Sequence, residues 1–375
     1  MKILIYDSEI TGHHLEYMHH IYSYAVNSAN EFIFVVNRAF VQEKDKFDWP
    51  EASNVEFVYL TEDEQSATEC SNLLKSGFKS SLILRKYVKQ LGVDRVWLIM
   101  FMKLMPFLPF LLPKGVPVSG ILYRIYLYDK IKFSGLRLFL EEIRYKILSK
   151  HKNIGKIFVL NDKESAKQLN EMYKTQNFVY LPDPIPYIDC TKLTSVREML
   201  SVDEKKVVYL HFGALDYRKG TIELLQAIDL LDSKIAEEKF FVFAGKINAE
   251  MKDEFYKLLE KNRNRHRIRV FDEFCSYEFL NNLCYSCDAI LVPYKNAIHS
   301  SGVIGYASFF KKPIIGPAAG MLGKIIEQYS MGVLLDEISP ESIKNALLQD
   351  LPNGSDLYVN EHKIENFCKV VFEGV

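Results

Sequence analysis

The chain of 375 residues carries 47 lysines and arginines against 48 aspartates and glutamates, and 48% of its residues are hydrophobic. A formal net charge of −1 argues against a protein that binds nucleic acid through its overall charge, and the length predicts two domains of similar size. Six cysteines without a regular framework, and a first apolar run of only strand length, predict a cytoplasmic protein without an export signal.

The first half of the chain alternates short apolar runs with amphipathic segments. We expect strands at 2–6, 31–36, 57–60, 96–100, 118–122 and 156–160, and helices at 14–25, 73–91 and 162–173. Strands that alternate with helices predict parallel βαβ units and an α/β fold with a doubly wound sheet. Ligands of such sheets bind beyond the carboxyl ends of the strands, where His13 and His14 follow the first strand.

Four histidines occur close together in the stretch GHHLEYMHH, which spans residues 12–20. A zinc site of the H-E-x-x-H type needs two histidines four residues apart on one helix face. His14 and His19 are five apart, and His13 and His20 are seven apart. We therefore expect no metal ion here. Two readings of His13 and His14 remain, contact with a substrate or a plain polar start of a helix.

Residues 119–156 are basic, with nine lysines and arginines against three acids, interleaved with aromatic residues. Leu136, Leu140, Ile143 and Ile147 form one apolar stripe at helical spacing. Such a segment is suited to rest on an anionic membrane surface, which would make the protein peripheral at the inner face of the membrane. The alternative is an ordinary helix whose apolar stripe faces the core and whose charged face is solvated.

Three prolines within five residues, at 182–186, predict the hinge between two domains. We expect an N-terminal domain at 1–186, a C-terminal domain at 187–352, and a tail at 353–375 whose helix packs back towards the first domain. The second domain repeats the alternation, with strands expected at 207–212, 240–244, 267–271, 289–292 and 314–315.

A strand, a loop and a helix follow one another in VVYLHFGALDYRKGTIELLQA, residues 207–227. Gly213 ends the strand, and Thr221 is the expected N-cap of the helix. Arg218 and Lys219 lie in the loop, where free N–H groups and the helix dipole favour an anion. The glycine spacing of a P-loop is absent, so the motif gives little support for an ATPase.

A second expected anion site follows the strand at 289–292, where Ser300, Ser301 and Gly302 open a helix that begins at Val303. Serines and a glycine at a helix start leave N–H groups free and let an oxygen approach closely. Together with Arg218 and Lys219, this turn could hold a diphosphate from two sides. Cys284 and Cys287 have metal-like spacing, but no further pair completes four ligands, so we read them as buried thiols.

These elements resemble the GT-B glycosyltransferases, family 4 in particular. The resemblance rests on G-x5-K-G at 213–220, on the serine-serine-glycine helix start, on K-P-x-I at 312–315 and on IIEQYSMGVLLD at 325–336. It implies two Rossmann-like domains facing across a cleft, the first for the acceptor and the second for the donor. In that family the lysine and a nearby arginine hold the nucleotide diphosphate, here Lys219 and Arg218.

The chain departs from the family pattern at three places. The two glutamates that the family usually carries are replaced by Ile298 and Tyr306, and Ala214 stands where an arginine often follows the glycine. A histidine of many members is missing near Tyr123 and Arg124. No catalytic residue can therefore be assigned, and His13, Arg124 and His299 are the candidates.

The expected function is a metal-independent, retaining glycosyltransferase (a hexosyltransferase of class EC 2.4). It would move a sugar from a nucleotide-sugar donor to a saccharide or lipid-linked acceptor in polysaccharide or glycan biosynthesis. Gly213, Arg218, Lys219 and 300–303 would bind the donor, and no further cofactor is expected. The alternatives are a non-catalytic GT-B protein that binds a nucleotide or a partner transferase, and a GT-B sugar-nucleotide epimerase.

Overall fold

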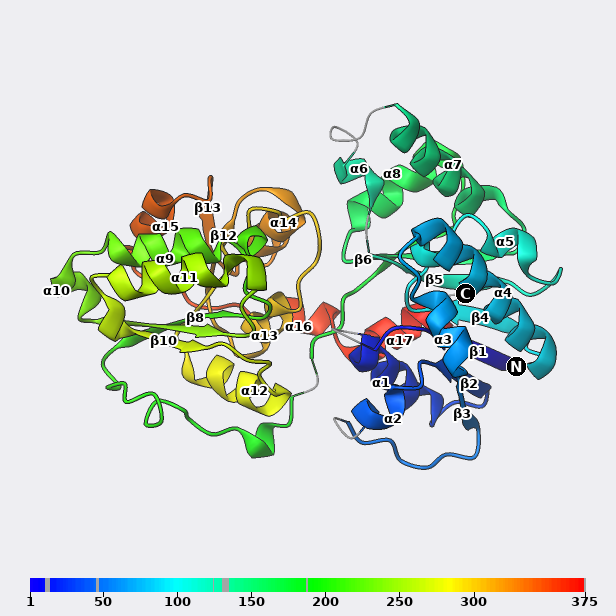
Figure 1. Ribbon diagram of the computed structural model, residues 1–375, viewed down its shortest axis with the longest axis horizontal. Coiled ribbons are helices and arrows are strands. Elements are labelled where there is room, and N and C mark those ends of the chain that lie inside the picture. The colour runs from blue at the N-terminus through cyan, green and yellow to red at the C-terminus, as the bar shows by residue number, and fades with distance from the viewer. Residues whose placement is uncertain (11–13, 45–46, 124, 130–134, 187, 374–375) are drawn as a thin grey trace. The chain divides into compact units, whose positions relative to one another are not determined.

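The computed structural model describes residues 1–10, 14–44, 47–123, 125–129, 135–186 and 188–373 (Figure 1). The chain forms two compact units. The first comprises Met1–Asp183 together with Ile364–Val375, and the second comprises Pro184–Lys363. The division falls inside the proline-rich stretch, three residues before the boundary expected from the sequence.

The first unit is built on a seven-stranded parallel sheet. Its strands are β1 (Lys2–Asp7), β2 (Glu31–Val36), β3 (Val55–Tyr59), β4 (Arg95–Leu98), β5 (Val118–Leu122), β6 (Ile154–Leu160) and β7 (Phe178–Leu181). Their order in the sheet is β3-β2-β1-β4-β5-β6-β7. The strand order therefore reverses between β1 and β4, and this reversal is the mark of a doubly wound sheet.

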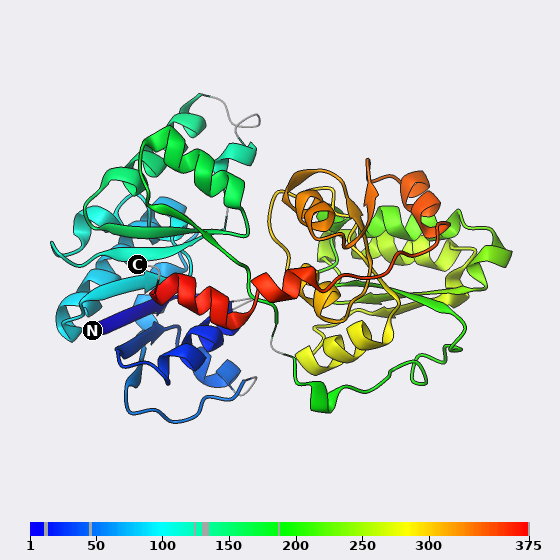
Figure 2. The ribbon, with the colours of Figure 1, turned by 180° about the vertical axis from the view of Figure 1, so that it is seen from behind.

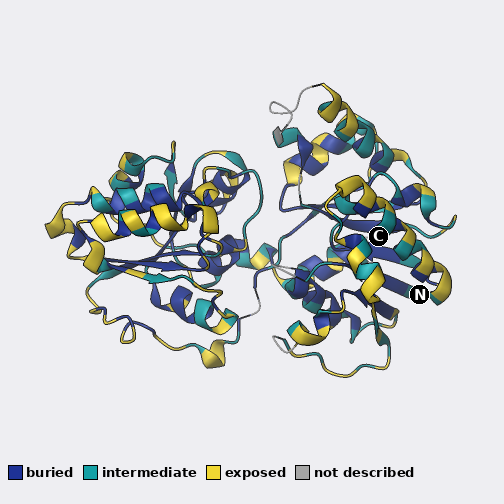
Figure 3. Cartoon of the chain, viewed as in Figure 1, coloured by how far each residue is buried: buried dark blue, intermediate teal, exposed yellow. Residues whose placement is uncertain are grey.

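Helices cover both faces of this sheet. They are α1 (His14–Ala25), α2 (Phe40–Glu43), α3 (Glu62–Thr68), α4 (Leu73–Leu91), α5 (Leu108–Leu111), α6 (Tyr126–Asp129), α7 (Leu136–Lys150), α8 (Lys163–Tyr173) and α17 (Ile364–Phe372). Side chains of α4, α5, α7 and α8 share one buried apolar cluster with the sheet. Side chains of α1 and α17 share the other. Figure 3 shows most strands as the buried centre of the unit, with the exposed residues on the helices and loops around them.

The second unit has a six-stranded parallel sheet. Its strands are β8 (Val207–Phe212), β9 (Lys239–Ala244), β10 (Ile268–Phe271), β11 (Ala289–Leu291), β12 (Ile314–Pro317) and β13 (Gly332–Leu335), in the order β10-β9-β8-β11-β12-β13. The order reverses between β8 and β11. The α/β class with two doubly wound parallel sheets, predicted from the sequence, is thus confirmed.

The helices of the second unit connect these strands. They are α9 (Thr221–Asp229), α10 (Ser233–Ala236), α11 (Ala249–Lys261), α12 (Tyr277–Ser286), α13 (Val303–Phe309), α14 (Gly320–Gln328), α15 (Pro340–Leu347) and α16 (Leu357–Glu361). Strand β13 was not expected from the sequence. It is only four residues long, begins at a glycine, and leaves three of its residues half-buried, so its apolar run is only the three residues 333–335.

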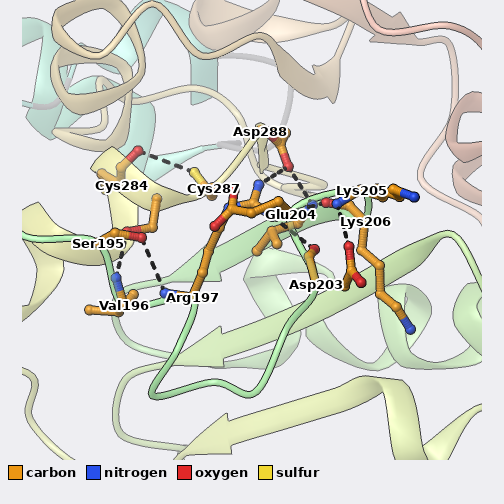
Figure 4. A network of polar contacts seen from close by, with 12 residues as sticks. Ser195, Val196, Arg197, Asp203, Glu204, Lys205, Lys206, Cys284, Cys287 and Asp288 are labelled. Atoms are coloured by element: carbon orange, nitrogen blue, oxygen red, sulfur yellow. Dashed lines mark hydrogen bonds and ion pairs between the residues drawn. The ribbon is translucent and has the colours of Figure 1, made fainter.

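Partly buried polar contacts hold together the amino ends of β8 and β11 (Figure 4). The guanidinium Nη2 of Arg197 lies 2.6 Å from Oδ2 of Asp288, and this oxygen also accepts the N–H of Val208 at 2.7 Å. Arg197 further donates to the carbonyl of Lys206 at 3.1 Å. The segment before β8 is therefore tied to the start of β11, at the end of the sheet opposite to the predicted ligand site.

Cys284 and Cys287 lie beside this network and are 0% and 1% exposed (Figure 4). Burial raises the pKa of both thiols, that of Cys287 to about 12, so neither is a thiolate near neutral pH. The sulfur of Cys287 donates to the carbonyl of Cys284 at 3.4 Å. Among the residues that the structure describes, no three histidine, cysteine or acidic side chains are grouped as metal ligands.

The tail, read from the sequence as one helix at 357–372, contains two helices (red in Figure 2). Helix α16 belongs to the second unit, where the ring of Tyr358 stacks on His362 at 3.5 Å. Helix α17 belongs to the first unit, where Phe367 is fully buried in the cluster with α1. In the described part of the chain, no helix combines the length and the apolar character needed to cross a bilayer.

Candidate functional site

The predicted anion-binding residues of the second unit lie on the loops that follow β8 and β11. These strands are neighbours and pair in parallel, with Ala289 opposite Tyr209 and Ile290 opposite Leu210. They are also the two strands between which the strand order reverses. Loops on either side of such a switch point diverge and leave room for a ligand, so the fold places both predicted motifs where doubly wound sheets bind theirs.

The loop after β8 turns twice at residues with positive φ. Gly213 has φ 97° and Gly220 has φ 68°, conformations that favour glycine. Between them, Tyr217–Lys219 form a 3₁₀ turn, and Asp216 caps it by accepting the N–H of Lys219 at 2.8 Å. The turn at 217–219 is therefore shaped by the glycine that follows it and by the side-chain cap of Asp216.

Thr221 is not the N-cap that the sequence predicts. Gly220 occupies the cap position, and Thr221 is the first residue of α9. The Thr221 hydroxyl lies 3.0 Å from Nε2 of His211, and Nδ1 of His211 lies 2.9 Å from the carbonyl of Leu291. Burial lowers the pKa of His211 to about 4, so this ring is neutral and links β8, β11 and α9. This role of His211 was not predicted, because a single histidine in an apolar strand gives no functional signal in the sequence.

Lys219 is a buried cation, with only 8% of its surface exposed. Its ammonium group lies where a side chain on Gly213 would begin, 2.6 Å from the position of that missing Cβ. It also lies 5.1 Å from the ring centre of Tyr294, which follows β11. Within the described residues, no carboxylate forms an ion pair with Lys219. A buried ammonium without a carboxylate partner is a natural counter-charge for an anionic ligand.

Arg218 lies at the edge of this site rather than inside it. Its side chain is 46% exposed, and its guanidinium is 3.5 Å from the carboxylate of Asp216 and 5.9 Å from the ring centre of Tyr294. The adjacent pair Arg218-Lys219 therefore divides into one exposed and one buried cation. The sequence alone could not distinguish the two.

The two loops touch each other through their backbones. The N–H of Lys295 donates to the carbonyl of Arg218 at 2.9 Å. A Cβ on Gly220 would lie 2.0 Å from the carbonyl oxygen of Pro293, so only glycine fits there. The close approach brings the Lys219 loop and the Tyr294 loop into one continuous wall.

The serine-rich turn lies further along the loop after β11. Helix α13 begins at Val303, and the carbonyl of Ser301 accepts the N–H of Ile304 at 3.0 Å. Gly302 has an ordinary φ of −56°, and a Cβ built on it would meet no atom within 4 Å. His299, Ser300 and Ser301 are half-buried, Gly302 is exposed and Val303 is buried. The space beside Gly302 is therefore open, and whether a phosphate oxygen occupies it stays a prediction.

A glycine turn from the next βα unit supports the start of this loop. Gly320 has φ 74°, and a Cβ there would lie 2.5 Å from the carbonyl oxygen of Ala297. The same carbonyl accepts the N–H of Leu322 at 3.2 Å. A similar close approach occurs at Gly245 after β9, where a Cβ would lie 1.9 Å from the carbonyl oxygen of Gly213. The sequence analysis singled out neither contact, because each joins residues distant in the chain.

Isoleucine and tyrosine occupy the two positions that carry glutamates in the resembling family, and the structure shows how they pack. Tyr306 is 7% exposed and packs edge-on against Phe212, with ring centres 5.5 Å apart. Ile298 is half-buried next to His299. No carboxylate takes the place of either glutamate at these two positions of α13 and its preceding loop.

In the first unit, the candidates His13 and Arg124 lie outside the described residues. His14 is described, and its Nδ1 lies 2.6 Å from Oδ2 of Asp7 at the end of β1. Burial lowers the pKa of His14, but the hydrogen bond and charge of Asp7 more than offset this effect and leave the pKa raised. Lys103, after β4, reaches the same strand end and pairs with Glu9 at 2.5 Å.

A second cluster of buried ionisable groups surrounds α1. The hydroxyl of Tyr17 donates to Asp183, the last residue of the unit before the second one begins. Burial, and then the charge of Asp183, raise the pKa of Glu16 to about 8. Burial lowers the pKa of His20 to about 3. The sequence predicted the helix that carries Glu16, Tyr17 and His20, but it gave no sign that their side chains would be enclosed together.

Comparison with known proteins gives one family match and many structural ones. Residues 194–362 match the model of the glycosyl transferases group 1 family. No curated protein sequence matches the chain significantly. All of the matched residues lie within the second unit.

Solved structures resemble the chain over nearly its whole length. HepE of Anabaena, solved with UDP and glucose, has a TM-score of 0.71 at 14% identity, with 100% of this chain and 99% of that one covered. WaaG, a glycosyltransferase of lipopolysaccharide biosynthesis, has a TM-score of 0.66 at 15% identity, with 99% and 95% covered. A UDP-forming trehalose-phosphate synthase of Burkholderia vietnamiensis has a TM-score of 0.70 at 9% identity, with 100% and 99% covered.

Identities this low establish a shared fold and nothing finer. The chain therefore has the GT-B glycosyltransferase fold, and its residues 194–362 match the glycosyl transferases group 1 family.

Proposed function

We propose that the protein is a glycosyltransferase that takes its sugar from a nucleotide-diphosphate donor bound by the second unit. The observation that carries this proposal is the buried ammonium of Lys219, which lacks a carboxylate partner in the described chain and lies beside the switch point between β8 and β11. Arg218 at the rim and the open turn at 300–303 supply further groups for the diphosphate. His299, beside this turn, is proposed to contact the sugar or a phosphate.

The proposed chemistry is transfer with a diphosphate leaving group. As the bond between the sugar and the diphosphate breaks, negative charge grows on the leaving phosphate oxygen. A fixed ammonium and fixed backbone N–H groups stabilise that charge without needing to reorganise. Because these groups are cationic or N–H donors, the proposal needs no metal ion. Retention of the anomeric configuration is proposed from the resemblance to family 4.

UDP is the nucleotide to test first, alone and as UDP-glucose. HepE was solved with UDP and with UDP-glucose, and the trehalose-phosphate synthase is UDP-forming. For the acceptor we propose a saccharide or a lipid-linked saccharide, in cell-surface polysaccharide or glycan biosynthesis.

An acceptor linked to lipid would require contact with the inner face of the membrane, and the segment 119–156 is proposed to supply it. In α7, Leu136 and Leu140 are 72% and 46% exposed, so the first half of the predicted apolar stripe does not face the core. Phe139 beside them is 57% exposed. The solvated-face alternative accounts for the charges of this helix but not for these three exposed apolar side chains.

Replacement of Lys219 tests the donor site. Lys219→Ala removes the buried ammonium but leaves the backbone of the turn intact, so it should weaken binding of a nucleotide sugar by about tenfold to a hundredfold, the range of a charge-assisted hydrogen bond. Isothermal titration with UDP, GDP and ADP sugars measures this change. Lys205→Ala, at an exposed lysine before β8, is the matched control and should bind as the parent does.

A second pair of variants tests the serine-rich turn independently. Because a Cβ on Gly302 meets no protein atom, Gly302→Val should fold normally and lose affinity only by blocking the phosphate. Ser301→Ala should have a small effect, since the proposed contacts are made by backbone N–H groups. Parent-like affinity in both Lys219→Ala and Gly302→Val would show that the donor site lies elsewhere.

A non-catalytic nucleotide-binding protein is the second candidate. It is favoured by one observation, that Tyr306 and Ile298 occupy the positions of the family's two glutamates. The two candidates differ in turnover. Binding of a nucleotide sugar without transfer to any acceptor, and without release of free nucleotide, would support the non-catalytic function.

A further inference from the structure

Helix α4 exposes an apolar stripe on the side that faces away from the sheet. Leu74, Phe78 and Leu82 follow one another at four-residue spacing and are 54%, 42% and 40% exposed, and Leu73 beside them is 83% exposed. A different side of the helix supplies Leu84 and Val88 to the core of the first unit. Core packing therefore explains one side of α4, whereas Leu74, Phe78 and Leu82 stay at least 40% exposed, although the ring of Phe78 also touches that of Phe107.

The charges of α4 all have the same sign. Its sequence, LLKSGFKSSLILRKYVKQL, contains five lysines and arginines and no acidic residue. Lys86 near the carboxyl end is paired with Glu64 of α3 at 2.7 Å. Lys75 and Lys79 flank the apolar stripe near the amino end, and no ion pair joins them to any described residue. The exposed part of α4 is thus apolar and cationic at once.

Two further helices on the same face of the sheet also expose apolar side chains. Helix α5 packs against α4, where the rings of Phe78 and Phe107 meet edge-on at 5.4 Å. Phe110 of α5 is 64% exposed and contacts His151, which follows α7, at 4.8 Å. Helices α4, α5 and α7 cover the same face of the sheet, as their shared buried cluster shows. We call the exposed apolar residues of these three helices the α4–α7 surface: Leu73, Leu74, Phe78, Leu82, Phe110, Leu136, Phe139 and Leu140.

These three helices carry a large share of the exposed apolar side chains of the described chain. Eight of the twenty large hydrophobic side chains exposed in the described chain belong to it. Figure 3 shows exposed residues along α4 and α7. Exposed apolar side chains bordered by lysines, as on α4, match the interface of a bilayer, where leucine and phenylalanine enter the acyl region and lysine side chains extend to the phosphates.

We propose that the α4–α7 surface docks the first unit on an anionic membrane, with the amino-terminal half of α4 as a principal contact. The charge of α4 decides for anionic lipid over a neutral protein partner, because lysines without counter-ions gain most from a negative surface. The proposal extends the membrane contact of residues 119–156 to a second helix, and in that sense rests on the proposed function. It requires no property of the donor site.

Sedimentation with vesicles tests the proposal on the full-length protein. Vesicles of neutral phospholipid alone are compared with vesicles containing about one third anionic phospholipid, without nucleotide. We expect the parent protein to bind the anionic vesicles and to dissociate as salt is raised, because screening shortens the reach of the lysines. Leu73→Ser/Leu74→Ser should lower the partition coefficient about tenfold, and Lys75→Glu/Lys79→Glu should lower it similarly on anionic vesicles.

Matched controls separate docking from folding. Phe274→Ser replaces a side chain that is 73% exposed on the second unit, and it should bind vesicles as the parent does. Tryptophan fluorescence checks the fold of the first unit, which contains both tryptophans of the chain, Trp49 and Trp97. Donor binding, measured without vesicles, should be unchanged in the α4 variants, so failure of the membrane proposal and failure of the donor site give different results.

Three outcomes would overturn the proposal. The first is no binding of the parent protein to either kind of vesicle. The second is parent-like binding by Leu73→Ser/Leu74→Ser and Lys75→Glu/Lys79→Glu together, which would confine any membrane contact to residues 119–156. The third is a parent protein that forms dimers which Leu73→Ser/Leu74→Ser dissociates, since the surface would then be an interface between two copies.

Discussion

At the scale of single residues, burial determines which groups carry charge. Glu16 and Lys219 illustrate two different results of enclosing an ionisable side chain. Burial and Asp183 raise the pKa of the Glu16 carboxyl to about 8, so this acid is neutral at physiological pH. Lys219 stays next to the ligand-facing loops, with Tyr294 as its nearest named aromatic contact. Ionising Glu16 would therefore cost free energy in the folded protein, whereas the ammonium of Lys219 is available as a counter-charge for an anionic ligand.

The Glu16 carboxyl makes a prediction about stability and pH. In the folded state it keeps its proton up to about pH 8, but in the unfolded chain it loses the proton near its ordinary pKa of 4.5. Stability therefore falls as pH rises from 4.5 to 8, by at most a few kcal/mol. Glu16→Gln removes this loss, so the variant should gain stability over the parent at pH 8.5 and little at pH 4.5.

Urea denaturation followed by tryptophan fluorescence measures this difference for the first unit alone. Glu56→Gln, at an exposed glutamate of β3, is the control, and its difference in stability from the parent should be the same at both pH values. A gain in Glu16→Gln that is equal at both pH values would contradict the raised pKa. His20 acts at the other end of the range, since its pKa of about 3 means that stability falls as pH drops below about 6.5.

At the scale of elements, the candidate site depends on glycines that allow loops to touch. Gly220 ends the 3₁₀ turn of the Lys219 loop and passes directly over the carbonyl of Pro293. The hydrogen bond from Lys295 to Arg218 depends on this approach. The position of the Lys219 ammonium is therefore set by β8 and β11 together.

A pair of glycine variants tests this dependence. Gly92→Ala and Gly220→Ala both place alanine at a positive φ, 59° and 68°, but only Gly220→Ala also brings a Cβ to 2.0 Å from a carbonyl oxygen. Gly92→Ala should cost about 1 kcal/mol and Gly220→Ala clearly more. Hydrogen exchange should increase at β8 and β11 in Gly220→Ala alone, with weaker donor binding. Equal costs in the two variants would show that the loops can separate easily.

At the scale of the whole molecule, the chain leaves the first unit, builds the second and then returns. Helix α17 completes the first unit with Phe367, Cys368 and Val371, all almost fully buried against α1 and the sheet. The first unit is consequently not a continuous segment of sequence. Its stability therefore depends on residues that follow the second unit in the chain.

Truncation of Phe367 tests this closure. Phe367→Ala removes a fully buried ring that lies 5.4 Å from the ring of Tyr17, and it should destabilise the first unit by about 3–5 kcal/mol. Tryptophan fluorescence would report the loss, and nucleotide binding by the second unit should remain. Leu357→Ala, at a 58% exposed position of α16, is the control. Unchanged unfolding of the first unit in Phe367→Ala would mean that α17 is dispensable.

The sequence by itself determined the fold class, because buried parallel strands are continuous apolar runs and the helices between them have a clear period. It also located the loops at 213–220 and 300–303, since glycines, serines and basic residues at strand ends have few other uses. Strand β13 was not predicted, because this half-buried strand has only three apolar residues after Gly332 and so gives a weak pattern. The cap at Thr221 was wrong because the hydroxyl pairs with His211 of the neighbouring strand.

Only the tertiary structure decided which charges are buried and which apolar side chains are exposed. Arg218 and Lys219 are neighbours in sequence, yet one is exposed and the other is enclosed between Gly213 and Tyr294, which lies on another strand's loop. The leucines of α4 have helical spacing like those of any core-facing stripe, but the helix has two apolar sides and the sheet can cover only one. Burial is a property of contacts between distant segments, and periodicity along one segment does not contain it.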